Sequence, residues 1–438
     1  MIENSSQNEY MRGYLTDYTE NEGCYTCKFK ETRMSDITIG DFWGIDKIYA
    51  IDSSEGISFF SYNTSKGKRI YDCIKDKLVL KLMTDYRHVI KANPSICKSI
   101  KKKKTVEDFR LKYEQEKSIS KAINYAVGKY RYDIALVLMF SENYGNALTN
   151  YGLYKFLEKL GKKVCVLDNF GTLFPKGKFN TFAHKYYNCS SDYLADNDFA
   201  NINTFSNMFI VGSDQTWNYQ CEQIHGFGSY YHLDFVNNDI PKIAYAPSYG
   251  ASDTYKEPDD DIVNLYKRFN AISVRESYGV DICKSQYGVN AVQVVDPVFL
   301  LEEGDYEKVA SQSGLNISEK FITAYILNPS REKIEYIRNV ARQKNIGKVV
   351  IILDAASEAE LINRELAGYY DCYFQICVEE WLYYFMNGTY IITDSFHGVC
   401  FATIFKKQFI AFRNRQSDRF NLFSKYGNLQ ENIYSDVS

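Results

Sequence analysis

The sequence predicts an α/β protein in which two domains, each built on a parallel sheet, follow a smaller α+β module. Three observations lead to this prediction. Short runs of consecutive apolar residues recur from residue 132 onward, as is typical of strands that are buried on both faces. Segments whose apolar residues have helical spacing alternate with these runs. Small or polar residues follow where the apolar runs end.

The composition is that of an ordinary globular protein. Of the 438 residues, 45% are hydrophobic and 24% are charged, which is enough for two or three domains. The formal net charge of −3 gives no reason to expect a nucleic-acid partner. No apolar run approaches the roughly 18 residues of a membrane span, and the polar N-terminus is no signal peptide. The 11 cysteines follow no framework spacing, which favours free thiols and a cytoplasmic location.

Residues 1–100 are expected to form the small module, whose chemistry lies in the Cys-x-x-Cys pair of Cys24 and Cys27. Such a pair can hold zinc, contribute to an iron–sulfur cluster or act as a redox dithiol. A metal site needs about four ligands, and only the isolated Cys73 and Cys97 could complete this set. The pair is therefore a weak metal signal.

Residues 101–130 are expected to form a charged linker helix. The segment begins with Lys101–Lys104 and continues with Glu and Lys at the spacing of an exposed helix. It would lead from the small module into the larger body.

The first Rossmann-like domain is predicted at residues 131–298. A helix at 147–160, ended by Gly161, makes the first right-handed β-loop-α-β unit, and its loop carries no dinucleotide fingerprint. Strands are expected at 132–139, 163–167, 208–211, 242–246, 271–274 and 292–295. The polar residues at the strand ends could be ordinary turn residues. We favour the alternative that they form the rim of a ligand-binding cleft, made by Asn143, Gly145, Asn146, Ser213, Asp214 and Ser248.

The second Rossmann-like domain is predicted at residues 299–438. Strands are expected at 321–327, 348–353, 390–393 and 408–411, with helices at 332–343, 378–386 and 399–405. Two such domains in tandem, with their loops facing a cleft, form a glycosyltransferase-B-like architecture. No carboxylate cluster with metal spacing is evident, so no metal is expected.

The turn from Asp394 to Gly398 joins a predicted strand to a predicted helix. Ligands of open α/β sheets bind at such turns, and the N–H groups of the helix start favour an anion. His397 could move a proton there. The alternative is that Asp394 or Ser395 caps the helix while His397 packs against it.

Six motifs follow one another in the larger part of the chain: Asn143-Tyr-Gly-Asn146, Val211-Gly-Ser-Asp-Gln-x-Trp-Asn218, Tyr245-Ala-x-Ser-x-Gly250, Ser273-Val-Arg-Glu276, Asp296-Pro297 and Thr393-Asp-Ser-Phe-His-Gly398. Taken together, they resemble the polysaccharide pyruvyl transferase family. Its members transfer pyruvate from phosphoenolpyruvate to sugar hydroxyls and form a ketal on glycans. The resemblance implies a transferase that uses phosphoenolpyruvate as donor and requires no cofactor. The implied acceptor is a sugar or glycan, nucleotide-linked or lipid-linked, the latter reached by peripheral membrane association.

The resemblance also implies roles for particular residues. His397 would transfer the proton. Asp394 or Asp214 would either orient the His397 imidazole or accept a proton from the sugar. Arg275, together with Ser395 and Gly398, would bind the donor, because a guanidinium matches phosphate and carboxylate. The alternative for Arg275 is a surface ion pair with a carboxylate.

One position departs from the family pattern. Members often carry an arginine two residues before this histidine, where Ser395 stands here. The departure leaves the identity of the donor open and calls for a substitute cation from Lys406, Arg413 or Arg415.

Residues 1–100 resemble the beta subunit of coenzyme F420-reducing hydrogenases and dehydrogenases, on the cysteine pair and the motifs at 33–44 and 56–67. Those enzymes bind flavin and iron–sulfur clusters, which would make Cys24 and Cys27 cluster ligands. Their other cysteine motifs lie upstream, so we expect no intact cluster, and both chain ends look short. Two alternatives to the transferase stay open: an iron–sulfur and flavin redox protein, or an inactive relative that binds glycans or anions.

Overall fold

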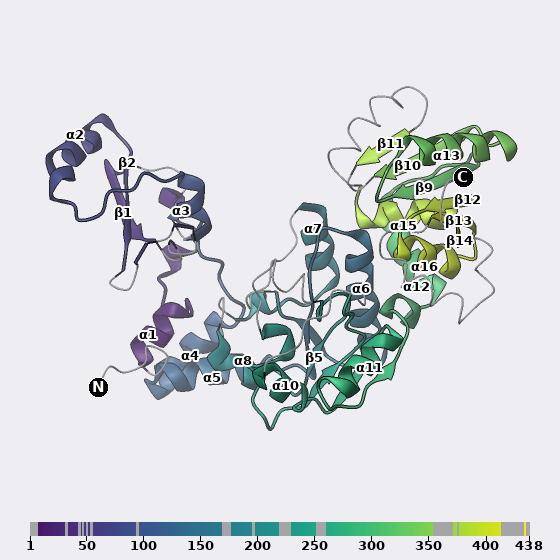
Figure 1. The fold of residues 1–438 in the computed structure, drawn as a ribbon. Helices are drawn as coiled ribbons and strands as arrows, with labels where there is room; N and C mark the ends of the chain where they lie inside the picture. Colours follow the sequence, from purple (N-terminus) through teal and green to yellow (C-terminus); the bar gives the residue numbers. More distant parts are fainter. Residues whose placement is uncertain are drawn as a thin grey trace. The chain divides into compact units, whose positions relative to one another are not determined.

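The computed structural model describes the chain in stretches that together form two compact units, residues 1–126 and 127–438 (Figure 1). The described residues are 8–30, 34–42, 45, 48–49, 51–52, 56–92, 96–168, 177–194, 198–218, 229–250, 260–353, 371–374, 376–412 and 433–434.

The first unit has the predicted α+β character. Strands β1 (Ile37–Asp41) and β2 (Ser58–Tyr62) pair in an antiparallel sheet, and a small core forms around Phe42, Phe59 and Val89. The helices of the unit are α1 (Glu9–Leu15), α2 (Ser65–Ile74), α3 (Tyr86–Ala92), α4 (Val106–Glu116) and α5 (Ile119–Gly128), with short 3-10 turns at Glu22–Cys24, Lys28–Lys30 and Lys75–Lys77.

The segment predicted as a linker, residues 101–130, is largely part of the first unit. Val106 and Phe109 of α4 are buried, and the Tyr18 hydroxyl lies 2.8 Å from that of Thr105. Arg110 donates to Glu22 at 2.6 Å. Helix α4 therefore has an apolar face that packs into the first unit, besides its charged residues. Because of this packing, the first unit extends to residue 126 and does not end at residue 100.

The first large domain contains a six-stranded, all-parallel sheet in the order β4-β3-β5-β6-β7-β8. All six predicted strands form, most of them shorter than expected: β3 (Ile134–Val137), β4 (Val164–Val166), β5 (Phe209–Val211), β6 (Lys242–Ala244), β7 (Ala271–Val274) and β8 (Val292–Gln293). The connecting helices are α6 (Tyr144–Lys159), α7 (Gly177–Tyr186), α8 (Phe199–Phe205), α10 (Asp260–Tyr266), α11 (Ser277–Ser285) and α12 (Glu303–Ala310), with 3-10 turns at Ser190–Asp192, Tyr230–His232, Pro297–Leu300 and Ser311–Ser313.

The second large domain contains another six-stranded parallel sheet, in the order β11-β10-β9-β12-β13-β14. The sequence predicted that helix α16 begins at residue 399, after His397 and Gly398. The helix in fact begins at Phe396, so both residues lie in its first turn. The strands are β9 (Phe321–Ile326), β10 (Lys348–Leu353), β11 (Asp371–Phe374), β12 (Tyr390–Thr393), β13 (Gln408–Phe412) and β14 (Ile433–Tyr434), and the helices are α13 (Arg331–Gln343), α15 (Val378–Asn387) and α16 (Phe396–Ile404).

The two large domains share one hydrophobic core. Leu148 and Tyr151 of α6 belong to the same buried cluster as Trp381 of α15 and Phe401 of α16. Helices α6 and α7 contact α15, and the separate cluster beneath α13 covers the other face of the second sheet (Figure 1). The domains therefore meet in a closed seam in this structure.

The order of strands reverses once in each sheet, between β3 and β5 in the first and between β9 and β12 in the second. Ligands of open α/β sheets bind outside the carboxyl ends of the strands at such a reversal. These two places are therefore where the fold itself directs the search for a site. None of the helices that the structure describes combines the length and apolar character that crossing a membrane requires.

Candidate active site at the domain seam

The His397 imidazole lies in the seam and reaches from the second domain to the first. Its Nε2 is 3.0 Å from the hydroxyl of Thr149 on α6 and 3.4 Å from a carboxylate oxygen of Asp296, which follows β8. The ring is only 7% exposed, and Thr149 and Asp296 are buried. Three segments that are far apart in the sequence thus meet at one imidazole.

The hydrogen bonds indicate which nitrogen of His397 carries a proton. The Thr149 hydroxyl donates its only hydrogen to Asp296 Oδ1 at 3.1 Å, so its oxygen accepts from Nε2–H. Nδ1 is then the nitrogen that can accept a proton, and among the described residues it has no hydrogen-bond partner. An imidazole oriented by a carboxylate in this way is suited to general base catalysis.

Gly145, in the first turn of α6, faces this accepting nitrogen. A Cβ atom at residue 145 would lie 2.1 Å from His397 Nδ1, closer than any real contact. The glycine therefore permits the imidazole to occupy its place in the seam.

Replacing Gly145 with alanine is expected to displace the imidazole and to lower the rate of the reaction by about 10²-fold, as a misplacement of about 1 Å can. The matched control is Gly304→Ala, in the first turn of α12, where an added Cβ meets nothing within 4 Å. Rates at saturating substrate and melting temperatures of both variants check the prediction. Parental activity in Gly145→Ala would show that the position of the ring is unimportant.

Arg275 is the centre of a buried ion-pair network behind His397. The side chain is 1% exposed, and its two terminal nitrogens bind Asp214, at 2.8 Å, and Asp296. The Asn146 amide donates to the other oxygen of Asp214 at 2.9 Å. Burial by itself would raise the pKa of the Asp296 carboxyl, but Arg275 and His397 oppose it and hold that pKa well below its usual range.

This placement bears on the predicted roles of Arg275 and Asp214. Arg275 is not the surface arginine of the alternative reading, because it is buried between two carboxylates. Each of its terminal nitrogens binds one carboxylate, so in this conformation the guanidinium positions Asp296, while its Nε is buried without a hydrogen-bond partner among the described residues. Asp214 contacts Arg275 and Asn146 and thereby joins the ends of β5 and β3 across the reversal in the first sheet.

Asp394 lies at the reversal in the second sheet. Its carboxylate accepts from the backbone N–H groups of Leu327, at 2.6 Å, and Asn328, at 3.0 Å, and pairs with Lys333 at 2.6 Å. These bonds fix the loop between β9 and α13. Among the described residues, the carboxylate within ion-pair distance of His397 belongs to Asp296, for which the sequence predicted no role, and not to Asp394.

The remaining predicted residues mostly shape the backbone around the seam. Asn143 caps α6 by accepting from Asn146 N–H at 3.2 Å, and Ser395 caps α16 by accepting from Gly398 N–H at 3.3 Å. A Cβ at Gly398 would lie 2.2 Å from the Thr393 hydroxyl, so this glycine lets α16 approach β12. The capping alternative for Ser395 is therefore realised in this structure.

Two hydroxyls on the rim behave differently. Ser248 donates to Glu276 at 2.5 Å, and Ser213 is buried without a hydrogen-bond partner among the described residues.

Of the cations predicted to substitute for the missing arginine, Lys406 is exposed and pairs with Glu303 at 2.9 Å. Arg413 and Arg415 lie outside the described residues, as do Trp43 and Gly44 of the N-terminal motif.

Cys24 and Cys27 are free and half-buried in the first unit. A hydrogen bond to Glu20 raises the pKa of the Cys24 thiol. Within the part of the chain that the structure describes, the one group of three or more metal-ligating side chains is Asp168, His184 and Cys189. No such group gathers around Cys24 and Cys27 there.

The fold and the seam together define the class: a two-domain α/β protein with a titratable dyad between Rossmann-like domains. The family follows from comparison with known proteins. Residues 143–416, more than half of the chain, match the polysaccharide pyruvyl transferase family, and the chain belongs to it. Membership supports a transferase that modifies glycans. Residues 2–85 match a second family, the C-terminal part of the coenzyme F420 hydrogenase/dehydrogenase beta subunit.

Solved structures resemble the chain only distantly. An S. aureus MnaA–UDP co-structure has 11% identity and a TM-score of 0.43, and the match covers 69% of this chain and 83% of that one. The UDP-GlcNAc 2-epimerase from Neisseria meningitidis bound to UDP-GlcNAc has 12% identity and a TM-score of 0.40, with 67% and 91% covered. A glycosyltransferase from Rickettsia africae has 11% identity and a TM-score of 0.39, with 68% and 88% covered. Among curated proteins there is no match.

Proposed function

We propose that this chain transfers pyruvate from phosphoenolpyruvate to a glycan or glycan precursor and forms a ketal. Two sugar hydroxyls form bonds to C2 of the donor, and the bond from C2 to the phosphate oxygen breaks. One hydroxyl proton ends on the methylene carbon, which becomes a methyl group, and the other leaves with the phosphate. The observation that supports this most directly is His397, which lies within the family match and is held by Asp296 and Thr149 with Nδ1 left to accept a proton.

His397 is the group proposed to carry the proton from a hydroxyl to the methylene carbon. Asp296 would keep the ring oriented and stabilise the imidazolium that forms in between. Because His397 is only 7% exposed, we infer that the two domains separate at the seam to admit the substrates. Hinge opening of this kind is common in two-domain enzymes.

Release of phosphate from phosphoenolpyruvate tests the proposed function. The acceptor panel contains nucleotide-linked sugars, lipid-linked sugars and cell-wall glycan precursors, and mass spectrometry identifies the product. Release that depends on an acceptor, with a pyruvylated product, would support the proposal. A donor that neither shifts the melting temperature nor reacts would contradict it. A cytoplasmic location and peripheral contact with a lipid-linked acceptor stay predictions.

Lys333 is the cation that we propose for donor binding in place of the arginine that Ser395 replaces. It lies in the first turn of α13, where free N–H groups favour an anion, and its side chain is 13% exposed. Asp394 holds its amine at the reversal of the second sheet, where a ligand of this fold binds. Sequence reasoning missed Lys333 because nothing in its neighbours distinguishes it from a helix-surface lysine.

Replacing Lys333 with methionine is expected to raise the KM for phosphoenolpyruvate by about 10–100-fold with a smaller change in kcat, because a charge-assisted hydrogen bond of about 1.5–3 kcal/mol is lost. Steady-state kinetics at saturating acceptor measure the effect. The matched control is Lys348→Met. Lys348 is an ion-paired lysine at the start of β10, so it lies at the amino ends of the strands and not at the carboxyl ends. An unchanged KM in Lys333→Met would remove Lys333 from the donor site.

A further inference from the structure

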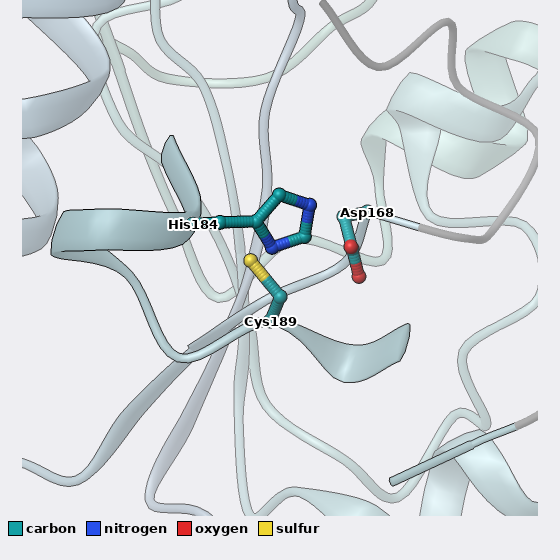
Figure 2. Close-up of side chains that lie close together, drawn as sticks. All are labelled: Asp168, His184 and Cys189. Atoms are coloured by element: carbon teal, nitrogen blue, oxygen red, sulfur yellow. The ribbon is translucent and has the colours of Figure 1, made fainter. Parts of the chain in front are cut away.

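A cysteine, a histidine and an aspartate that take no part in the His397 site gather beside the edge strand of the first sheet. Asp168 follows β4, His184 lies in the last turn of α7, and Cys189 precedes the turn Ser190–Asp192. Their ligand atoms all lie within 4.8 Å of one another. Figure 2 shows the imidazole, the thiol and the carboxylate together, each supplied by a different segment.

We propose that Asp168, His184 and Cys189 bind a divalent metal ion of the zinc class. Carboxylate oxygen, imidazole nitrogen and thiolate sulfur are the ligands that zinc takes in proteins. The sulfur ligand disfavours magnesium and calcium, which require oxygen. Three protein ligands leave one position of a tetrahedron for water.

The separations fit a site that closes by a small side-chain movement. Ligand atoms around a tetrahedral zinc lie about 3.5 Å apart, given metal–ligand bonds of about 2.0–2.3 Å. The present separations are all at most 4.8 Å, so a movement of roughly 1 Å is enough to bring them to about 3.5 Å. His184 is exposed and can make this movement, while Cys189 is buried and stays in place.

The Asp168 carboxylate is already held in a fixed orientation. Its Oδ1 accepts from the Ser190 hydroxyl at 2.9 Å and from Ser191 N–H at 2.7 Å, and its Oδ2 accepts from the Ser191 hydroxyl at 2.5 Å. An ionised carboxylate has about four acceptor positions, so Oδ2 retains one for a metal. Hydrogen bonds of this kind orient ligating carboxylates in metal sites.

The backbone also fixes the thiol. Cys189 forms a parallel bridge with Val166 at the end of β4, where Val166 N–H donates to Asn188 at 2.8 Å. The alternative is that Asp168 only caps the turn Ser190–Asp192. Capping would explain the position of the carboxylate, but it would not explain why a buried thiol and an imidazole from α7 lie beside it. Bound there, the ion would join the end of β4 to α7, and no step of the proposed transfer passes through it.

Zinc titration of the full-length protein tests the site. The parent for all variants is Cys24→Ser/Cys27→Ser, which removes the Cys-x-x-Cys pair as a competing zinc ligand. After chelator treatment, zinc chloride is added in competition with a chromophoric chelator, and we expect one ion per chain. His184→Ala and Cys189→Ser should each weaken binding at least about 100-fold, and Ser191→Ala about 10–100-fold, as loss of an outer-shell hydrogen bond does.

The control is Cys73→Ser, an exposed cysteine of the first unit, which should bind zinc like the parent. With cobalt in place of zinc, the parent should show a sulfur-to-metal charge-transfer band that Cys189→Ser lacks. Parental zinc affinity in His184→Ala, or a cobalt complex without that band, would overturn the proposal. His184 is exposed, so His184→Ala decides the question even where Cys189→Ser fails to fold.

Discussion

Replacing His397 with alanine is expected to lower acceptor-dependent release of phosphate from phosphoenolpyruvate by about 10²–10⁴-fold, the contribution of a positioned general acid or base. The reason is geometric: its Nε2 is bound by Thr149 at 3.0 Å and lies 3.4 Å from Asp296, while Nδ1 is left to accept a proton. Initial rates of phosphate release with an active acceptor, over a range of pH, measure the effect.

A histidine outside the family match provides the control. His88 in α3 lies near the hydroxyls of Tyr49 and Thr84 in the first unit, and His88→Ala should keep the parental rate. A His397→Ala variant that folds and retains the parental rate would exclude the imidazole from the chemistry. Equal loss of rate in both variants would point to general damage and not to proton transfer.

Most strands of the two large sheets could be predicted from the sequence because buried parallel strands appear in it as short apolar runs, whereas β11 and β14 were not predicted. The strands predicted at 348–353 and 390–393 coincide with β10 and β12. Three of the polar residues that the sequence places at strand ends, Asn146, Asp214 and His397, lie at or beside the two reversals of strand order, and their role in a site stays a prediction. The hydrophobic pattern thus located the carboxyl ends of the strands, where these polar residues lie.

The partners of those polar residues could not be predicted, because they depend on how distant segments meet. Thr149 and His397 are separated by 248 positions in the chain, and their contact requires the two domains to pack together. Asp296 formed part of a family motif, but only the packing shows that it lies beside His397 while Asp394 binds Lys333. Local spacing carries no information on such pairings.

Replacing Arg275 with methionine is expected to lower the free energy of unfolding by about 3–5 kcal/mol and the melting temperature by roughly 10 °C. The change leaves Asp214 and Asp296 as buried carboxylates without their cation. Thermal unfolding followed by circular dichroism measures it, with the exposed Arg342→Met as control. A parental melting temperature combined with a KM for phosphoenolpyruvate raised about 100-fold would instead return Arg275 to the donor-binding role.

The loss in Arg275→Met should also depend on pH. In the parent, the pKa of Asp296 is lower in the folded than in the unfolded chain, so its contribution to stability is present above about pH 4 and is lost as the pH falls through the folded pKa. In the variant, burial without Arg275 raises the carboxyl pKa values, so acidification protonates the stranded groups and stabilises the folded chain. The difference in melting temperature between parent and variant should therefore shrink on acidification from pH 7 toward pH 4. Adding Asp214→Asn and Asp296→Asn to Arg275→Met should recover part of the loss at pH 7, because no unpaired charge is then buried. A difference that stays constant with pH would show that the stability lost with Arg275 comes from packing and not from its charge.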